Sequence, residues 1–199
     1  MYPMIQRYFK APVTAFITPI CRALLRIGLS ANAITVIGAA GVAFSSIYFF
    51  ARGEFFLGTL LVSLFALSDL FDGTMARISK SDGTPWGALL DSTLDRISDA
   101  AIVIGIWIYL FNEGSDLHVL AIAALFLGGL IPYIRAKAES LGIECSVGFA
   151  ERPERLIILL VGTVLYGLGL DFALGLSLWL LAFISSITVI QRMKAVHQA

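Results

Sequence analysis

The chain has 199 residues, of which 58% are hydrophobic and 14% are charged, and its formal net charge is zero. Soluble domains carry about 25% charged residues, so this composition, with a mean hydropathy of +0.88, excludes an ordinary water-soluble domain. The neutral balance also gives no reason to expect a nucleic-acid partner.

The first 30 residues are predicted to form an amphipathic helix that lies in the membrane interface. From Val13 onward, apolar residues alternate with Arg22 and Arg26, which is typical of such helices. The stretch from Gly28 to Ser30 ends the pattern, and Ser30 can cap the next helix. A cleavable signal peptide is not expected, because a continuous apolar region and an A-x-A-like site are lacking.

The rest of the chain contains six apolar runs, at residues 33–50, 55–67, 100–111, 117–134, 156–170 and 172–190. A membrane-spanning helix needs about 20 mostly apolar residues. The second and third runs reach that length only if their helices extend forward to Arg77 and back to Trp86. We therefore predict an all-α integral membrane protein in which residues 31–199 form a six-helix bundle, and residues 1–199 form one domain.

The basic residues favour one orientation of this bundle. With six spans, nearly all of them flank the same side as the two termini, whereas Arg52 lies on the opposite side. Basic residues accumulate on the cytoplasmic side, so we predict a multi-pass plasma-membrane protein with both termini in the cytoplasm. Cys21 and Cys145 then lie on the reducing side, where a disulfide is not expected.

Two pairs of aspartates stand at the cytoplasmic ends of the second and third spans. Asp69 and Asp72 are three residues apart, and Asp91 and Asp95 are four apart, so each pair shares one helix face. Antiparallel neighbouring helices would bring the pairs together, where four carboxylates repel unless cations neutralise them. Mg²⁺, or alternatively Mn²⁺, prefers such oxygen ligands. Four carboxylates suit one or two such ions, and we expect two.

The residues between the aspartates indicate what the ions would bind. Gly73, Ala76 and Gly87 leave backbone space beside the acids, and Arg77 supplies a fixed charge suited to a phosphate. We therefore expect a nucleotide or pyrophosphate substrate at a cytoplasmic active site.

These residues carry a family resemblance. The pattern Asp69-x-x-Asp72-Gly73-x-x-Ala76-Arg77, followed after nine residues by Gly87-x-x-x-Asp91-x-x-x-Asp95, resembles the signature of the CDP-alcohol phosphotransferases. The stretch "SANAIT" resembles the Pro-Asn-x-Ile-Thr element of that family, with Ala31 where proline is common.

The resemblance implies a Mg²⁺-dependent transfer of a substituted phosphate from a CDP-linked lipid, here CDP-diacylglycerol, to an alcohol, with release of CMP. Asp69, Asp72 and Asp91 would be metal ligands, and Asp95 would be both a ligand and the catalytic base. The CDP-diacylglycerol site would include Asn32, Ala33, Ile34, Thr35, Gly73, Arg77 and Thr84. Members of the family are commonly homodimers, and we expect the same here.

A second group of basic residues is the candidate site for the acceptor. It comprises Arg135, Lys137, Arg152, Arg155 and Arg192, all on the cytoplasmic side. Ordinary cytoplasmic charge bias is one explanation, and a pocket for a phosphate on the acceptor is the other. Pro153 predicts a helix start that puts two of these arginines in a first turn, where the helix dipole repels cations unless an anion is bound.

Three local segments, "RISDA", "YIRAKAESLGI" and "FAERPERLII", resemble the prokaryotic phosphatidylinositol-phosphate synthase branch of the family. That resemblance implies inositol-1-phosphate as acceptor, with glycerol-3-phosphate, giving phosphatidylglycerol phosphate, as the alternative. Clustered intramembrane acids can also form the pathway of an ion-coupled transporter or channel. Asp99, one turn beyond Asp95, is expected to pair with a neighbouring basic group.

Overall fold

The structure is a computed structural model that describes residues 17–79, 84–149 and 151–199. Every regular element in these ranges is helical, as expected for an all-α protein. A first helix covers residues 17–26. The others are α2 (Ala31–Phe49), the 3₁₀ turn η1 (Phe50–Arg52), α3 (Phe55–Ala66), α4 (Ser68–Ser79), α5 (Pro85–Asn112), α6 (Leu117–Ser140), α7 (Arg152–Gly167) and α8 (Phe172–His197).

Four stretches of the described residues are long and apolar enough to cross a membrane. They are Ala31–Arg52, Phe55–Ser79, Leu117–Ser140 and Phe172–His197. The other two predicted spans correspond to α5, which carries three aspartates and an arginine between residues 91 and 99, and to α7, whose 16 residues are fewer than a full span requires. The chain is therefore a membrane protein, and its six crossings stay a prediction.

The second predicted span differs from a single continuous helix. It consists of α3 and α4, which meet at Leu67. At this junction α2 approaches closely, because a side chain added at Gly38 would collide with Ser68. The break gives α4 a helix N-terminus of its own, with Asp69 in its first turn.

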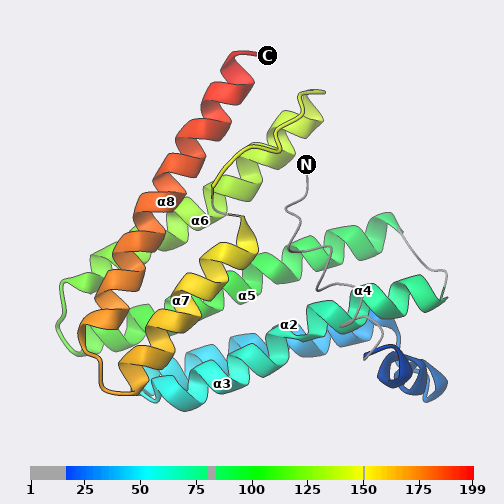
Figure 1. The fold of residues 1–199 in the computed structure, drawn as a ribbon, viewed down its shortest axis with the longest axis horizontal. Helices are drawn as coiled ribbons and strands as arrows, with labels where there is room; N and C mark the ends of the chain where they lie inside the picture. Colours follow the sequence, from blue (N-terminus) through cyan, green and yellow to red (C-terminus); the bar gives the residue numbers. More distant parts are fainter. Residues whose placement is uncertain (1–16, 80–83, 150) are drawn as a thin grey trace.

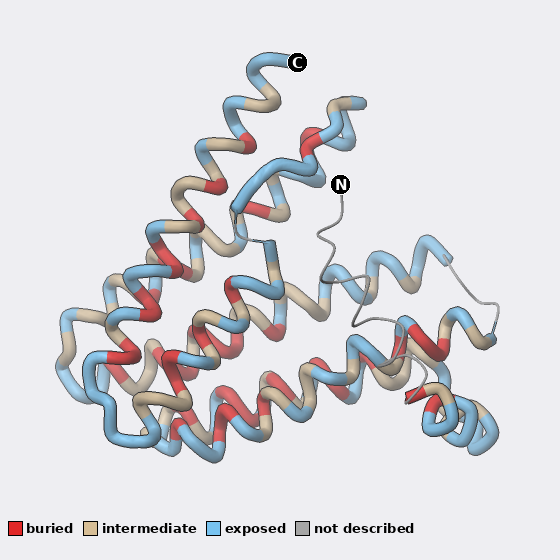
Figure 2. The backbone as a smooth tube through the Cα atoms, in the orientation of Figure 1, coloured by how far each residue is buried: buried red, intermediate tan, exposed pale blue. Residues whose placement is uncertain are grey.

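The helices converge at the end of the molecule that holds the α5–α6 and α7–α8 connections, and they spread apart at the other end (Figure 1). The first turn of α7 lies within this opening. Buried residues concentrate on the faces between helices, whereas the start of α5 is mostly exposed (Figure 2). The charged residue Asp91 near the start of α5 is therefore accessible from outside the bundle.

The core lies at the convergent end. Phe50, Phe55, Ile106 and Leu178 are each at most 1% exposed and belong to one apolar cluster. A buried hydrogen bond of 2.8 Å from the Thr59 hydroxyl to the Thr163 hydroxyl joins α3 to α7. The outer faces expose large apolar side chains, including Phe44, Leu64, Phe126, Trp179 and Phe183, as expected for contact with lipid.

The short helix at residues 17–26 is part of the predicted amphipathic helix, whose earlier residues lie outside the described ranges. Ile17 and Cys21 are buried against Met75 of α4, whereas Ile20 and Ile27 are exposed. Burial raises the pKa of the Cys21 thiol, which makes it a poor nucleophile. The location of this helix in the membrane interface stays a prediction.

Candidate active site

The two predicted aspartate pairs meet where α4 and α5 run beside the start of α2. Asp69 lies in the first turn of α4, where the helix dipole stabilises a carboxylate. Asp72, only 9% exposed, accepts a 2.7 Å hydrogen bond from the Thr35 hydroxyl of α2. On α5, Asp91 is exposed and interacts electrostatically with both Asp69 and Asp72. The predicted convergence of the pairs is therefore present.

One arginine from α7 joins this cluster. Arg152 donates a 2.6 Å hydrogen bond to Asp69 Oδ2 and lies 2.9 Å from Asp95 Oδ1. Its Nε also donates to Asp99 Oδ1 at 3.3 Å. A single guanidinium thus partly neutralises three carboxylates from two helices that would otherwise repel one another.

The carboxylates fit a divalent ion by their chemistry, since hard cations prefer oxygen ligands. In the described ranges, however, no group of three or more histidine, cysteine, aspartate or glutamate side chains is arranged as an ion-binding set. Arg152 contacts one oxygen each of Asp69 and Asp95, so a guanidinium already neutralises part of the charge on these two carboxylates.

The residues predicted for the nucleotide surround the starts of α2 and α5. Thr84 caps α5, and its hydroxyl accepts the Gly87 N–H at 3.1 Å. A side chain at Gly87 would also come within 3.5 Å of Asn32 Oδ1, so the two helix starts adjoin. Ala33 and Ile34 lie in the first turn of α2 and are half-buried.

On α4, the environment of Gly73 agrees with its predicted role. A Cβ at Gly73 would meet nothing within 4 Å, which leaves space beside the acids. Arg77 lies one turn further along and donates to the Thr74 hydroxyl at 3.0 Å. Both residues are placed where a ligand bound by the aspartates could reach them.

A basic cavity of about 190 Å³ adjoins the acids on the side of α6 and α8. It is lined by Arg96, Ile131, Pro132, Arg135, Glu151, Arg152, Pro153, Arg155 and Arg192. Four of the five basic residues predicted to bind the acceptor phosphate are thus brought together, while Lys137 does not line the cavity.

The arginines of this cavity are held in different ways. Arg155, 8% exposed, lies 3.8 Å from Asp99. Arg192, 3% exposed, donates to the Ile131 carbonyl at 2.7 Å and to the Val147 carbonyl at 2.9 Å, which also ties α8 to α6. Arg135 is half-exposed and forms a 2.8 Å ion pair with Glu139. Arg192 therefore has a structural role that its position in the sequence did not indicate.

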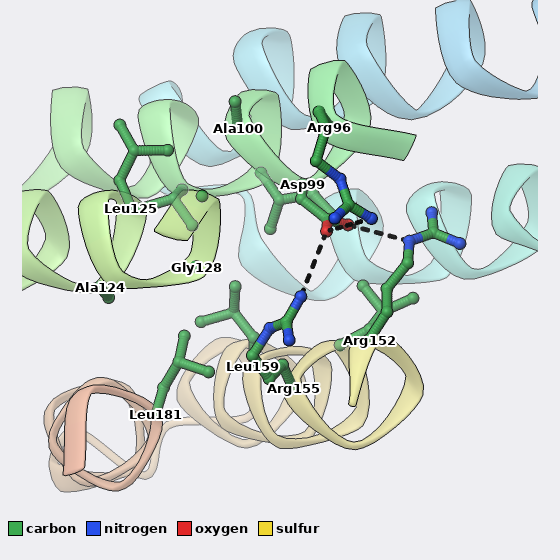
Figure 3. A pocket seen from close by; sticks show the side chains of 14 residues that line it. Arg96, Asp99, Ala100, Ala124, Leu125, Gly128, Arg152, Arg155, Leu159 and Leu181 are labelled. Carbon is green, nitrogen blue, oxygen red and sulfur yellow. Dashed lines mark hydrogen bonds and ion pairs between the residues drawn. The ribbon is translucent and has the colours of Figure 1, made fainter. Parts of the chain in front are cut away.

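The expected pairing of Asp99 is confirmed. It lies 3.9 Å from Arg96 as well as near Arg152 and Arg155, and the close view in Figure 3 shows the three guanidinium groups around its carboxylate. Arg96, which also lies 3.7 Å from Asp95, was not predicted as a site residue. Its place in the predicted third span was the signal, because charges within a span are functional candidates by default.

A comparison with known protein families decides which family the chain belongs to. Residues 29–190 match the family model described as CDP-alcohol phosphatidyltransferase. The chain belongs to this family. It is therefore an enzyme and not a transporter or channel, as the family resemblance of the aspartate signature implied.

Individual relatives of the family are similar over nearly the whole chain. A protein named phosphatidylinositol phosphate synthase from Streptomyces avermitilis is 40% identical to this chain. The match covers 98% of this chain and 83% of the relative. A protein of the same name from Mycobacterium tuberculosis is 39% identical, and the match covers 98% of this chain and 90% of the relative.

Two crystal structures of the Mycobacterium tuberculosis phosphatidylinositol phosphate synthase PgsA1 have the same fold. The one with CDP-DAG bound has a TM-score of 0.85 at 39% identity and covers 90% of this chain and 92% of its own. The one in complex with manganese and citrate has a TM-score of 0.83 at 39% identity, and the match covers 90% of this chain and 88% of the PgsA1 chain.

Proposed function

We propose that this protein transfers the phosphatidyl group of CDP-diacylglycerol to inositol-1-phosphate, giving phosphatidylinositol phosphate and CMP. One observation carries the proposal: Arg152 contacts both the acid cluster and the basic cavity, so a site for a diphosphate and a site for a second phosphate share a wall. The names of the relatives and the CDP-DAG bound to PgsA1 support the same reaction.

At the donor end, Asp69, Asp72, Asp91 and Asp95 would hold two Mg²⁺ ions, or Mn²⁺ in their place. When bound, such ions neutralise the diphosphate and stabilise the charge of the leaving CMP. The manganese in a PgsA1 structure supports a role for a divalent ion in the proposed reaction. The open space beside Gly73 leaves room for the nucleotide.

An apolar groove of about 320 Å³ between α3 and α7 suits an acyl chain of the donor. Its wall includes Leu60, Ser63, Ile157 and Val161. Ser63 precedes Asp69 by six residues across the junction of α3 and α4, and Ile157 follows Arg152 by less than two turns of α7. The groove thus begins near the acids and runs toward the convergent end, so a chain can stay in an apolar setting while its phosphate reaches the site.

In the reaction, the acceptor hydroxyl oxygen forms a bond to the phosphorus that carries diacylglycerol, and the bond from that phosphorus to CMP breaks. Asp95 takes the hydroxyl proton. This carboxylate suits the role because it is largely sheltered, at 19% exposed, and borders the basic cavity through Arg152. A general base must lie within hydrogen-bond reach of the proton it accepts.

The acceptor is tested by CMP release from CDP-diacylglycerol and Mg²⁺ with four alcohols. Inositol-1-phosphate should give the fastest turnover, and free inositol and serine should give little, because they lack the phosphate that the arginines bind. Glycerol-3-phosphate also carries a phosphate. If it is the better acceptor, the enzyme makes phosphatidylglycerol phosphate instead.

Arg155→Ala tests the acceptor cavity itself. Loss of a charge-assisted hydrogen bond costs about 1.5–3 kcal/mol, so the KM for inositol-1-phosphate should rise about 10- to 100-fold while that for CDP-diacylglycerol changes little. Arg52→Ala is a matched control, because that arginine stacks 3.6 Å from the centre of the Tyr48 ring, far from the cavity. Equal effects on both KM values would reject the acceptor cavity.

Asp95→Asn tests the catalytic base. The variant keeps the size of the side chain but cannot accept the proton, so CMP release should fall by about 100-fold or more. Normal thermal unfolding of the variant would exclude a folding defect. Unchanged turnover would assign the base to another residue.

For the topology, we propose six crossings with α5 and α7 as additional spans, both termini and the active site in the cytoplasm, and the plasma membrane as location. Single cysteines introduced at Asn112 and Leu141 should report opposite sides in membrane-impermeant labelling, because the 24 residues of α6 separate these positions. Labelling from the same side would contradict the topology. The homodimer stays a prediction.

A further inference from the structure

A second cavity, of about 300 Å³, adjoins the basic one, with which it shares three arginines, and is lined by residues of α5, α6, α7 and α8. Its wall is mostly apolar and includes Val103, Leu125, Leu159 and Leu181. One end is charged, because Arg152 and Arg155 line it together with Arg96 and Asp99. Figure 3 shows the polar groups on one side of the space, and Leu125 and Leu181 away from them. The cavity is thus amphipathic.

The α6 wall of this cavity is unfilled. Gly128 and Gly129 line it, and a Cβ at either position would meet nothing within 4 Å. Gly128 is half-buried and Gly129 is exposed, so the space is open along α6 and a chain can enter it there. Two successive glycines that leave such a space are more readily explained if the space holds a ligand.

The charged end has more positive than negative groups. Asp99 is surrounded by the guanidinium groups of Arg96, Arg152 and Arg155, although Arg152 also contacts acids of the active site. In the part of the chain that the structure describes, Arg96 Nε is a buried donor without a hydrogen-bond partner. A buried donor of this kind costs free energy until an acceptor reaches it. An anionic group at this end would supply one.

From the apolar wall, the empty α6 face and the cationic end, we infer that this cavity binds the single alkyl chain of an anionic amphiphile. Its head group contacts Arg96 and Arg155, and its chain extends along Leu125 toward Leu181. A cavity of about 150 Å³ holds one benzene molecule, so this one holds a chain on the order of ten carbons. Because the head group meets arginines of the basic cavity, binding also competes with the phosphorylated acceptor. That competition rests on the proposed function, whereas the binding does not.

Equilibrium binding of radiolabelled alkyl phosphates to the purified protein in glycoside detergent tests the site without any turnover. After correction for partition into micelles, affinity should rise about fourfold per methylene from octyl to decyl phosphate. Dodecyl phosphate should bind at least tenfold more tightly than dodecyltrimethylammonium, which has the same chain and a cationic head. An affinity independent of chain length, or equal for the two heads, would overturn the inference.

Gly128→Leu tests the location, because its side chain would enter the empty space (Figure 3). It should weaken binding of dodecyl phosphate at least tenfold, whereas Val119→Leu, on the exposed face of the same helix, should leave it unchanged. Ala124→Leu fills the cavity from another position on α6. If the glycine variant unfolds, the binding of dodecyl phosphate to this second variant tests the location. Unchanged binding in a folded cavity-filling variant would show that the chain does not occupy this cavity.

Discussion

Arg152→Gln should make the protein bind divalent metal ions more tightly. In the structure the Arg152 guanidinium contacts Asp69 Oδ2 at 2.6 Å and Asp95 Oδ1 at 2.9 Å, which are oxygens that the proposed metal site needs. A metal ion must displace these contacts before it can bind. Removing the guanidinium therefore removes a competitor, and it also leaves the carboxylates to repel each other until a cation arrives. Both effects act in the same direction.

The exposure of the side chains sets the size of the effect. Asp69 is 40% exposed, so its ion pair contributes at the low end of the range of about 0–1 kcal/mol for exposed pairs. Asp95 is 19% exposed and Arg152 is 22% exposed, so their pair contributes about 1 kcal/mol or slightly more. The total is about 1–2 kcal/mol. Since about 1.4 kcal/mol is a factor of ten, the Kd for the ion should fall about 5- to 30-fold.

Calorimetric titration of Mn²⁺ into the purified protein at pH 8, without substrates, measures this Kd directly. Arg135→Gln is the matched control, because its guanidinium pairs with Glu139 and not with the acids. The control should bind Mn²⁺ as the unmodified protein does. Weaker or unchanged binding in a folded Arg152→Gln variant would show that the arginine does not compete with the ion.

Two further predictions concern stability, and thermal unfolding in detergent micelles checks both. Arg192→Met should lower the free energy of unfolding by about 2 kcal/mol or more, because it removes two hydrogen bonds that the charged guanidinium donates to the Ile131 and Val147 carbonyls. An unchanged unfolding midpoint would contradict the structural role of this arginine. Gly105→Ala should cost about 1–3 kcal/mol, because the added methyl group would collide with the Ser46 carbonyl where α2 crosses α5. Stabilisation, as helix propensity alone would give, would refute this close approach.

The positions of most helices could be predicted from the sequence because hydropathy is a local property. The runs that begin at Ala33, Leu117 and Phe172 begin within two residues of α2, α6 and α8. The break at Leu67 was not predicted, since no proline or glycine marks it. It coincides with the close approach of α2 at Gly38, which is a contact between segments about 30 residues apart.

In the candidate site, too, local features could be predicted from the sequence, whereas contacts between distant helices could not. The spacing of the aspartates fixed which of them share a helix face, and the structure places both pairs together. The partner of each arginine could not be predicted, because it depends on how α7 and α8 pack against the rest of the bundle. Arg152 and Arg192 line one cavity. That Arg152 also contacts the acids, and that Arg192 binds backbone carbonyls, could not be read from the sequence.

The first turn of α7 connects the two halves of the site through one electrostatic cause. Arg152 is the first residue of this helix, directly before Pro153, where the dipole disfavours a cation. Asp69, Asp95 and Asp99 offset that cost, and in doing so they hold the start of α7 against α4 and α5. Because a guanidinium presents several donors in a fixed plane, it can contact all three carboxylates, which the compact ammonium of a lysine does less well. The charges that position α7 are therefore the same charges that place the acid cluster beside the basic cavity, so the fold at this point and the proximity of the two sites are not independent properties.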